Sequence, residues 1–159
     1  MKLAIAAVFA AGLVLGSVAT VRAQERTPEH TAPAYDEALA KRIGADEHGM
    51  RRYVLVILRT GPKRVPDGKE RDAMFAGHFA NMERLSAEGK LALAGPFGKN
   101  EDGWRGLFVF AVSSVDEAKA LTATDPVIVN GEMIAEYHPW FGSAAVMIVP
   151  ETHKRLEKR

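Results

Sequence analysis

The sequence YVLVIL at residues 53–58 is an unbroken apolar run that is rich in β-branched side chains. Arg52 precedes it, and Thr60, Gly61 and Pro62 close it. A short run of this kind between polar and turn residues is typical of a buried strand. We therefore place the first strand of the folded core here.

Toward the C-terminus, a polar loop leads to helical periodicity from residue 70 to residue 88, and Gly89 ends it. With successive residues 100° apart, seven side chains fall within one arc of about 140°. We expect that arc to face the core: Met74, Phe75, His78, Phe79, Met82, Leu85 and Ser86. Five others are expected on the solvent face: Asn81, Glu83, Arg84, Ala87 and Glu88.

The next two strands are predicted at residues 91–97, where a Gly-Pro step stops the run, and at residues 106–112. The polar turn at residues 99–103 is short, which indicates an antiparallel hairpin. Beyond it, Ser114 and Glu117 match a capping box and predict a helix over residues 115–122. A short helical segment or turn is then predicted to begin at an Asp-Pro step and to end near residue 131. Alternating side chains at residues 132–140 predict the last strand of the sheet.

The order strand, helix, strand, strand, helix, strand predicts an α+β fold of the ferredoxin-like type, with both helices on one face of an antiparallel sheet. The strands are apolar on both faces, as Leu55 and Val56 show in one strand and Phe108 and Val109 in another. The uncovered face therefore needs a partner. A second copy of the chain is the simplest partner, so we expect a two-fold homodimer.

Residues 1–23 have the pattern of a secretory signal peptide, with a basic start, an apolar stretch and small residues before a cleavage site after Ala23. We expect a periplasmic or secreted protein, and an uncleaved anchor that just spans a bilayer is the alternative. Residues 24–51 are predicted to be a linker with a short peripheral helix at residues 35–43. Residues 52–149 form the domain, and residues 150–159 a charged tail, which we expect to be a frayed helix from residue 151 onward.

Composition excludes several function classes. The 159 residues contain no cysteine, which rules out disulfides and thiolate chemistry. The 21 basic residues become 19 without Lys2 and Arg22, against 20 acidic ones, so the mature chain has no electrostatic reason to bind nucleic acid or an anionic membrane. The five histidines lack metal-site spacing, and no glycine-rich phosphate loop is present. We predict no metal and no cofactor.

Several segments resemble the YCII-related (YciI-like) family: GHFANMERL at residues 77–85, GKL at 89–91 and LAGPF at 93–97, then GLFVF at 106–110, ATDP at 123–126 and AEYHPW at 135–140. The resemblance implies a dimeric α+β barrel of ferredoxin-like domains. It also implies an active site built on a helix histidine and the aspartate of the Asp-Pro step, which here are His78 and Asp125. Export departs from the family's usual pattern.

His78 is the candidate general acid/base, because an imidazole side chain can take and return a proton and a carboxylate would fix its tautomer. Asp125 is the candidate carboxylate. Each residue also has a structural explanation: His78 as a hydrogen-bonded core histidine, and Asp125 as the N-cap of a helix whose first residue is Pro126.

Four further residues are predicted to contact a substrate. Phe75 and Tyr137 would line an apolar pocket, with the Tyr137 hydroxyl as a donor, and Pro96 and Phe97 would shape its rim. Plain core packing and a strand terminator are the alternatives. Arg105 and Lys99 would attract an anionic substrate, unless they are ordinary solvated loop charges.

Three functions remain open from the residues alone. The first is an enzyme that uses His78 and Asp125 for cofactor-independent proton transfer, of isomerase or lyase type, on a small ring compound. The second is a module of the same fold that binds a small molecule without transforming it. The third is a purely structural dimer.

Overall fold

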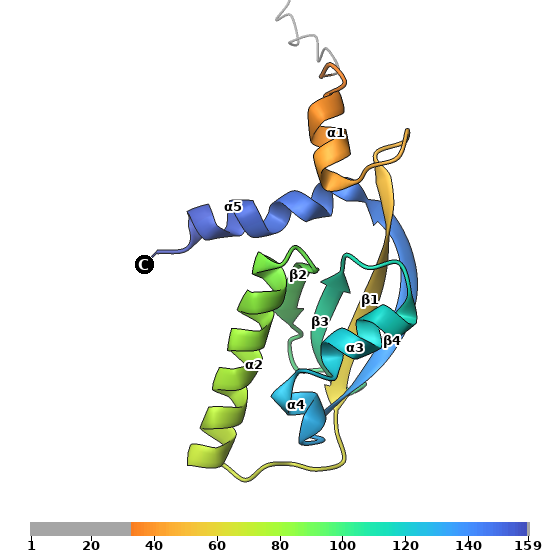
Figure 1. The fold of residues 1–159 in the computed structure, drawn as a ribbon. Coiled ribbons are helices and arrows are strands. Elements are labelled where there is room, and N and C mark those ends of the chain that lie inside the picture. The colour runs from red at the N-terminus through yellow and green to blue at the C-terminus, as the bar shows by residue number, and fades with distance from the viewer. Residues whose placement is uncertain (1–32, 159) are drawn as a thin grey trace, which may run out of the picture. The chain divides into compact units, whose positions relative to one another are not determined.

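A computed structural model describes residues 33–158. The signal peptide predicted at residues 1–23 lies outside the described residues. Four strands form one sheet in the order β2-β3-β1-β4, and every neighbouring pair is antiparallel (Figure 1). This order is ferredoxin-like and confirms the predicted α+β fold. The strands are β1 (Met50–Thr60), β2 (Leu91–Pro96), β3 (Trp104–Phe110) and β4 (Met133–Ser143).

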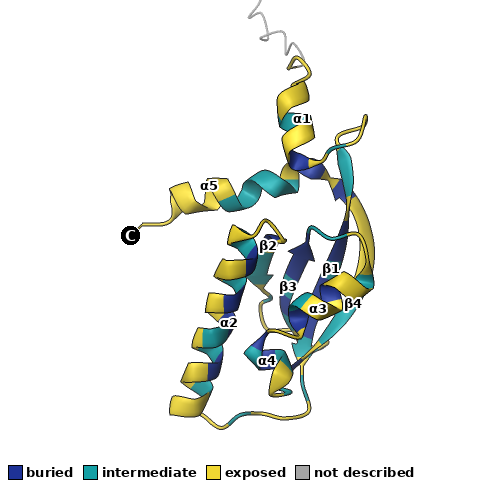
Figure 2. Cartoon of the chain, in the orientation of Figure 1, coloured by how far each residue is buried: buried dark blue, intermediate teal, exposed yellow. Residues whose placement is uncertain are grey.

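Helices α2 (Lys69–Ala87), α3 (Val115–Thr122) and α4 (Pro126–Val129) lie on one face of the sheet (Figure 1). The main core fills the space between these helices and the sheet, where the buried residues gather (Figure 2). No helix within residues 33–158 is long and apolar enough to cross a membrane. The buried apolar residues of this core are Val54, Val56, Leu58, Met74, Leu85, Leu91, Phe108, Phe110, Ala118, Val127 and Met133.

Local signals fix the ends of the helices as predicted. The capping box at the start of α3 is complete, since the Ser114 side chain accepts from the Glu117 N–H and the Glu117 carboxylate accepts from the Ser114 N–H. The predicted peripheral helix is present as α1 (Glu37–Ile43), and Gly44 ends it with a left-handed φ of 68°. These signals depend only on neighbouring residues, so they could be recognised from the sequence.

The buried face of α2 differs from the predicted arc. Phe79 is 57% exposed, although the arc placed it in the core, and Asn81 is buried, although it was assigned to solvent. The buried positions are Met74, His78, Asn81 and Leu85. The reason is a polar contact that apolar periodicity cannot show: the Asn81 carbonyl accepts from the Thr124 hydroxyl at 2.9 Å, just before α4.

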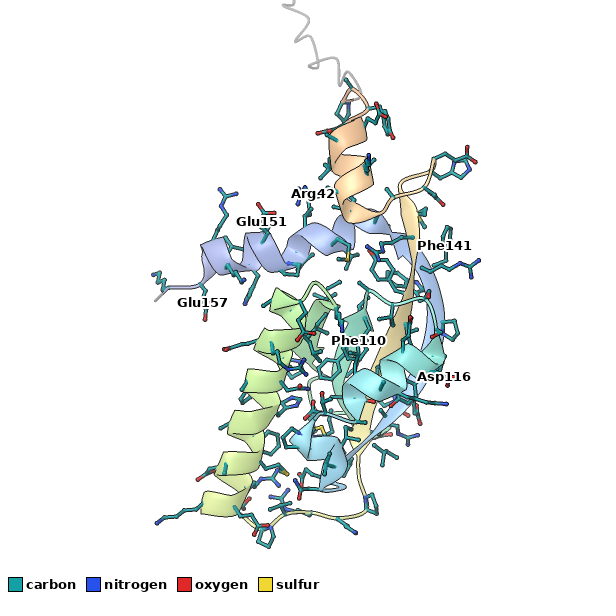
Figure 3. The ribbon with its side chains drawn as sticks, in the orientation of Figure 1. Arg42, Phe110, Asp116, Phe141, Glu151 and Glu157 are labelled. Carbon is teal, nitrogen blue, oxygen red and sulfur yellow. The ribbon has the colours of Figure 1, made fainter. Side chains whose placement is uncertain are left out.

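The end of the chain contains the expected helix, but β4 is longer than predicted and an unpredicted 3-10 helix precedes the tail. β4 continues to Ser143 instead of stopping at residue 140, and a 3-10 helix, η1 (Ala144–Ile148), and helix α5 (Val149–Leu156) follow it. The Nη1 of Arg42 in α1 lies 3.5 Å from the Oε2 of Glu151 in α5, and the two side chains are labelled in Figure 3. Val146 and Met147 of η1 pack on the second face of the sheet, against Tyr53, Ala92 and Val109.

Much of the second face stays uncovered by the chain. Leu93, Ile134 and Trp140 project from its strands and are 37%, 44% and 38% exposed. On the same face, Arg59, next to the last residue of β1, donates to Glu136 of β4 at 2.6 Å. Exposed apolar side chains of this kind favour coverage by a partner, which stays a prediction.

Candidate functional site

The structure brings His78 of α2 and Asp125 together, although 47 positions separate them in the sequence. The His78 Nδ1 lies 2.8 Å from the Asp125 Oδ2 and 3.0 Å from its Oδ1. The side chain of His78 is 9% exposed and that of Asp125 is fully buried. The pair is therefore shielded from water, which strengthens its electrostatic interaction.

A close approach of two helices places this pair. Gly77 precedes His78, and a Cβ atom at Gly77 would lie only 2.9 Å from the Cγ of Pro126. Pro126 is the first residue of α4, directly after Asp125. The missing side chain at Gly77 thus lets the start of α4 pack against α2, beside the histidine.

Asp125 is also the N-cap of α4, so both roles considered from the sequence coexist. Its Oδ1 accepts from the Val127 N–H at 3.2 Å, while Oδ2 is the nearer oxygen to His78. The capping bond restricts rotation of the carboxylate. The helix start therefore holds the carboxylate in the orientation that meets the histidine ring.

The contact determines which ring nitrogen of His78 is free. An ionised carboxylate only accepts hydrogen bonds, so Nδ1 must carry the proton that points at Asp125. In the neutral ring, Nε2 then carries a lone pair. Within residues 33–158, Nε2 makes no hydrogen bond, and no fully buried side-chain N or O atom lacks a partner, so Nε2 is not fully buried.

Aromatic rings surround the histidine. The rings of His78 and Phe108 are stacked with centroids 6.0 Å apart, and Phe75 meets His78 edge-on at 6.1 Å. Phe79 approaches at 5.4 Å from the exposed side of α2. An unprotonated nitrogen beside three phenyl rings suits the face of a small ring compound.

The rim residues predicted from the Gly-Pro-Phe segment lie toward the hairpin turn. Pro96 is exposed and pairs with Gly106, and the Phe97 ring packs on Trp104 at 5.2 Å. Their role in binding a substrate therefore stays a prediction. Phe75, in contrast, is at the histidine ring.

The Tyr137 hydroxyl has a partner on α3. It shares a hydrogen bond with the Thr122 hydroxyl, and either oxygen can be the donor. The Thr122 hydroxyl also lies 3.1 Å from the Lys119 carbonyl, to which it can donate. The donor role of Tyr137 toward a substrate therefore stays a prediction.

A buried ionic cluster was missed from the sequence. Glu132 is 2% exposed, and its Oε1 lies 2.8 Å from the Arg71 Nη1 and 3.7 Å from the Arg105 Nη1. Its Oε2 accepts from the Val65 N–H at 2.8 Å. Burial alone would raise the pKa of Glu132, but this N–H and the two arginines together hold it below its usual value. No local motif signals such a contact between distant residues.

Two hollows lie away from His78. One, of about 770 Å³, is lined partly by Arg51, Arg52 and Lys90, with the exposed Phe141 at its wall (Figure 3). The other, of about 610 Å³, lies among α2, β2 and α5. The part of the chain that the structure describes contains no group of three or more histidine and acidic side chains arranged to hold a metal ion.

Comparison with known proteins places the chain in a family. A family model described as the YCII-related domain matches residues 52–140. The chain belongs to the YCII-related domain family. This match confirms the predicted resemblance and covers the sheet, α2, α3 and α4, together with the segments that carry His78 and Asp125.

Two similar proteins accompany the family match. The YCII-related protein described as "Uncharacterized protein YjpA", from Bacillus subtilis (strain 168), is 29% identical over 91 residues, which span 57% of this chain and 95% of that protein. A solved structure of 5-chloro-2-hydroxyhydroquinone dehydrochlorinase from Burkholderia phenoliruptrix AC1100, in complex with 2,5-dihydroxybenzoquinone, is 23% identical. The likeness covers 55% of this chain and 92% of that one, with a TM-score of 0.40.

Proposed function

We propose that this YCII-related protein is an enzyme that transfers protons on a small ring compound, with His78 as the general base and Asp125 as its positioning residue. The observation that supports the proposal is the contact of Nδ1 with both Asp125 oxygens, which leaves the Nε2 of the neutral ring with a lone pair and with no hydrogen-bond partner among the described residues. A base held in this way needs no metal to accept a proton.

The chemistry follows from the position of that lone pair. Nε2 takes a proton from a ring carbon that an adjacent carbonyl makes acidic, and the C–H electron pair moves into the ring. In an isomerisation, His78 returns the proton at another atom. In an elimination, the electron pair forms a double bond and expels a leaving group with its own bonding electrons. Asp125 stabilises the imidazolium that forms in either case.

Proton exchange measures this activity without knowledge of the natural substrate. A panel of hydroxylated rings, quinones and lactones is incubated with the mature protein in deuterated water, and NMR follows loss of each ring proton. We expect exchange of at least one class of compound, reduced by about 100-fold or more in His78→Gln, as is typical of a lost general base. His48→Gln, at an exposed histidine, is the matched control. Equal exchange by His78→Gln and the wild type would sink the proposal.

We also propose that two copies associate through the uncovered face of the sheet. Supporting observations are the partly exposed Leu93, Ile134 and Trp140 and the ion pair of Arg59 with Glu136 on the same face. Export to the periplasm or beyond is a further proposal, based on residues 1–23. Mass spectrometry of the protein from its native host tests it, since cleavage should leave Gln24 at the N-terminus.

A binding module is the second candidate function, and one observation favours it. Among residues 33–158, the hydrogen bonds and the ion pair of His78 involve Asp125 alone, so no second acid contacts the ring. A site with one base and no partnered acid suits binding as well as catalysis. Stabilisation by a ring compound with no proton exchange across the panel would support this second function.

A further inference from the structure

Arg105 occupies an irregular position in β3. In the pairing of β1 with β3, Leu58 lies opposite Gly106 and Arg59 lies opposite Trp104, so Arg105 is an extra residue in a β-bulge. A bulge changes the direction of a side chain. The Arg105 Nη1 lies 3.7 Å from the Glu132 Oε1, which Arg71 of α2 also contacts, so the guanidinium lies on the helix-covered face of the sheet.

The two arginines of this cluster, Arg71 and Arg105, differ in their hydrogen bonds and in their exposure. Arg71 donates to the Val65 carbonyl at 2.9 Å, pairs with Glu132 at 2.8 Å and lies over the Phe75 ring. Its side chain is 14% exposed. Arg105 is 31% exposed and makes no hydrogen bond among the described residues. Arg71 also lies 3.4 Å from Asp67, which Arg64 contacts as well. Three arginines therefore meet two carboxylates, which leaves one positive charge in excess. The N–H donors of Arg105 are the ones without a hydrogen bond among the described residues, so they are free for a ligand.

This free charge lies near the His78 ring. Arg105 precedes Phe108 by three residues, which is about 10 Å along a strand. His78 stacks on Phe108, and Phe75 bridges His78 and Arg71 through an edge contact on one side and a cation–π contact on the other. A guanidinium, an aromatic surface and an unprotonated imidazole nitrogen therefore lie in sequence along one side of β3.

We propose that Arg105 binds an anionic substituent of the substrate, a carboxylate or an ionised ring hydroxyl. The substrate is then a small ring acid whose ring lies beside the partly buried Phe75, with its acidic C–H at Nε2 of His78. This inference rests on the function proposed above. A guanidinium suits this role because it can hold two oxygens at once. It would also stabilise the negative charge that enters the ring when the proton leaves.

Fluorine NMR with 4-fluorobenzoate and its neutral counterpart 4-fluorobenzamide tests the proposal. We expect the mature protein to bind the benzoate at least about tenfold more tightly than the amide, since a hydrogen bond to a charged group contributes about that much. Arg105→Gln should remove the difference, and Arg105→Lys should keep part of it. Arg155→Gln, at an exposed arginine of α5, is the control and should bind both probes as the wild type does.

Thermal unfolding of each variant shows whether loss of Arg105 merely disturbs the Glu132 cluster. The proposal is overturned if the benzoate does not bind, if both probes bind alike, or if a folded Arg105→Gln keeps the preference. These outcomes differ from the result that would reject the proposed enzymatic function. Proton exchange that depends on His78 but not on Arg105 would reject only the anion site. A benzoate preference that depends on Arg105, with no proton exchange, would reject only the catalytic role.

Discussion

At the scale of single residues, the site depends on how each polar group is partnered. Asp125 serves His78 and the first turn of α4 at once. The Tyr137 hydroxyl shares a hydrogen bond with the Thr122 hydroxyl. The Nε2 of His78, in contrast, has no hydrogen-bond partner within residues 33–158, so it is the atom left free for chemistry.

The buried carboxylate of Glu132 leads to a prediction about how stability depends on pH. Its pKa is lowered in the folded protein, because its N–H and arginine partners outweigh burial. Its contribution to the free energy of unfolding is therefore complete above the unfolded pKa of about 4.3 and is lost as pH falls through the lower folded value. We expect Glu132→Gln to destabilise the protein at neutral pH by about 3 kcal/mol, as breaking a buried ion pair does.

Urea unfolding from pH 7 down to the acid limit measures this effect. The difference in unfolding free energy between the wild type and Glu132→Gln should shrink in the acid range. Glu101→Gln, in the exposed turn between β2 and β3, should match the wild type throughout. A Glu132→Gln difference that does not change with pH would show that the carboxylate charge is not what stabilises the cluster.

At the scale of elements, the contact of α2 with α4 positions the histidine and its carboxylate. We expect Gly77→Ala to force the helices apart, because the new Cβ would lie 2.9 Å from Pro126. Alanine favours a helix by about 1 kcal/mol over glycine, so overall stability should change little. The low-field proton signal of the His78 Nδ1–H should weaken. Gly98→Ala, where a Cβ meets no atom within 4 Å, is the control, and an unchanged signal in Gly77→Ala would contradict this assignment.

The elements also show which features the sequence could predict. Ser114 with Glu117, and Gly44 and Gly89 at helix ends, are local signals, and the structure has each of them in the predicted role. The pairing of His78 with Asp125 was predicted from the family resemblance, since no spacing rule relates residues so far apart in the sequence. The burial of Asn81 and the cluster around Glu132 depend on partners from other elements, so periodicity could not reveal them.

At the scale of the whole molecule, the uncovered sheet face is the main open surface. η1 covers one part of it through Val146 and Met147, and the rest still exposes Ile134 and Trp140. Burying apolar side chains of this size stabilises an association by about 1.5–3 kcal/mol each. The second face therefore favours a self-complementary contact between two copies.

Light scattering after size-exclusion chromatography tests this contact. We expect the mature wild type to have twice the mass of one chain, and Ile134→Glu to shift it to a single chain by placing a carboxylate in the contact. Val129→Glu, on the exposed side of α4, should leave the mass unchanged. A wild-type mass of one chain, or a dimer that survives Ile134→Glu, would argue against this face.

The most direct test of the central claim is the tautomer of His78, read from the nitrogen-15 shifts of both ring nitrogens at a pH where the ring is neutral. We predict that the wild type carries the proton on Nδ1. In Asp125→Asn, the amide oxygen keeps the cap on Val127 and the amide NH₂ faces Nδ1, so the proton should move to Nε2. Asp116→Asn, at an exposed carboxylate of α3, should change neither shift. A wild-type proton on Nε2, or a tautomer that Asp125→Asn leaves unchanged, would contradict the role of Asp125 in preparing His78 as a base.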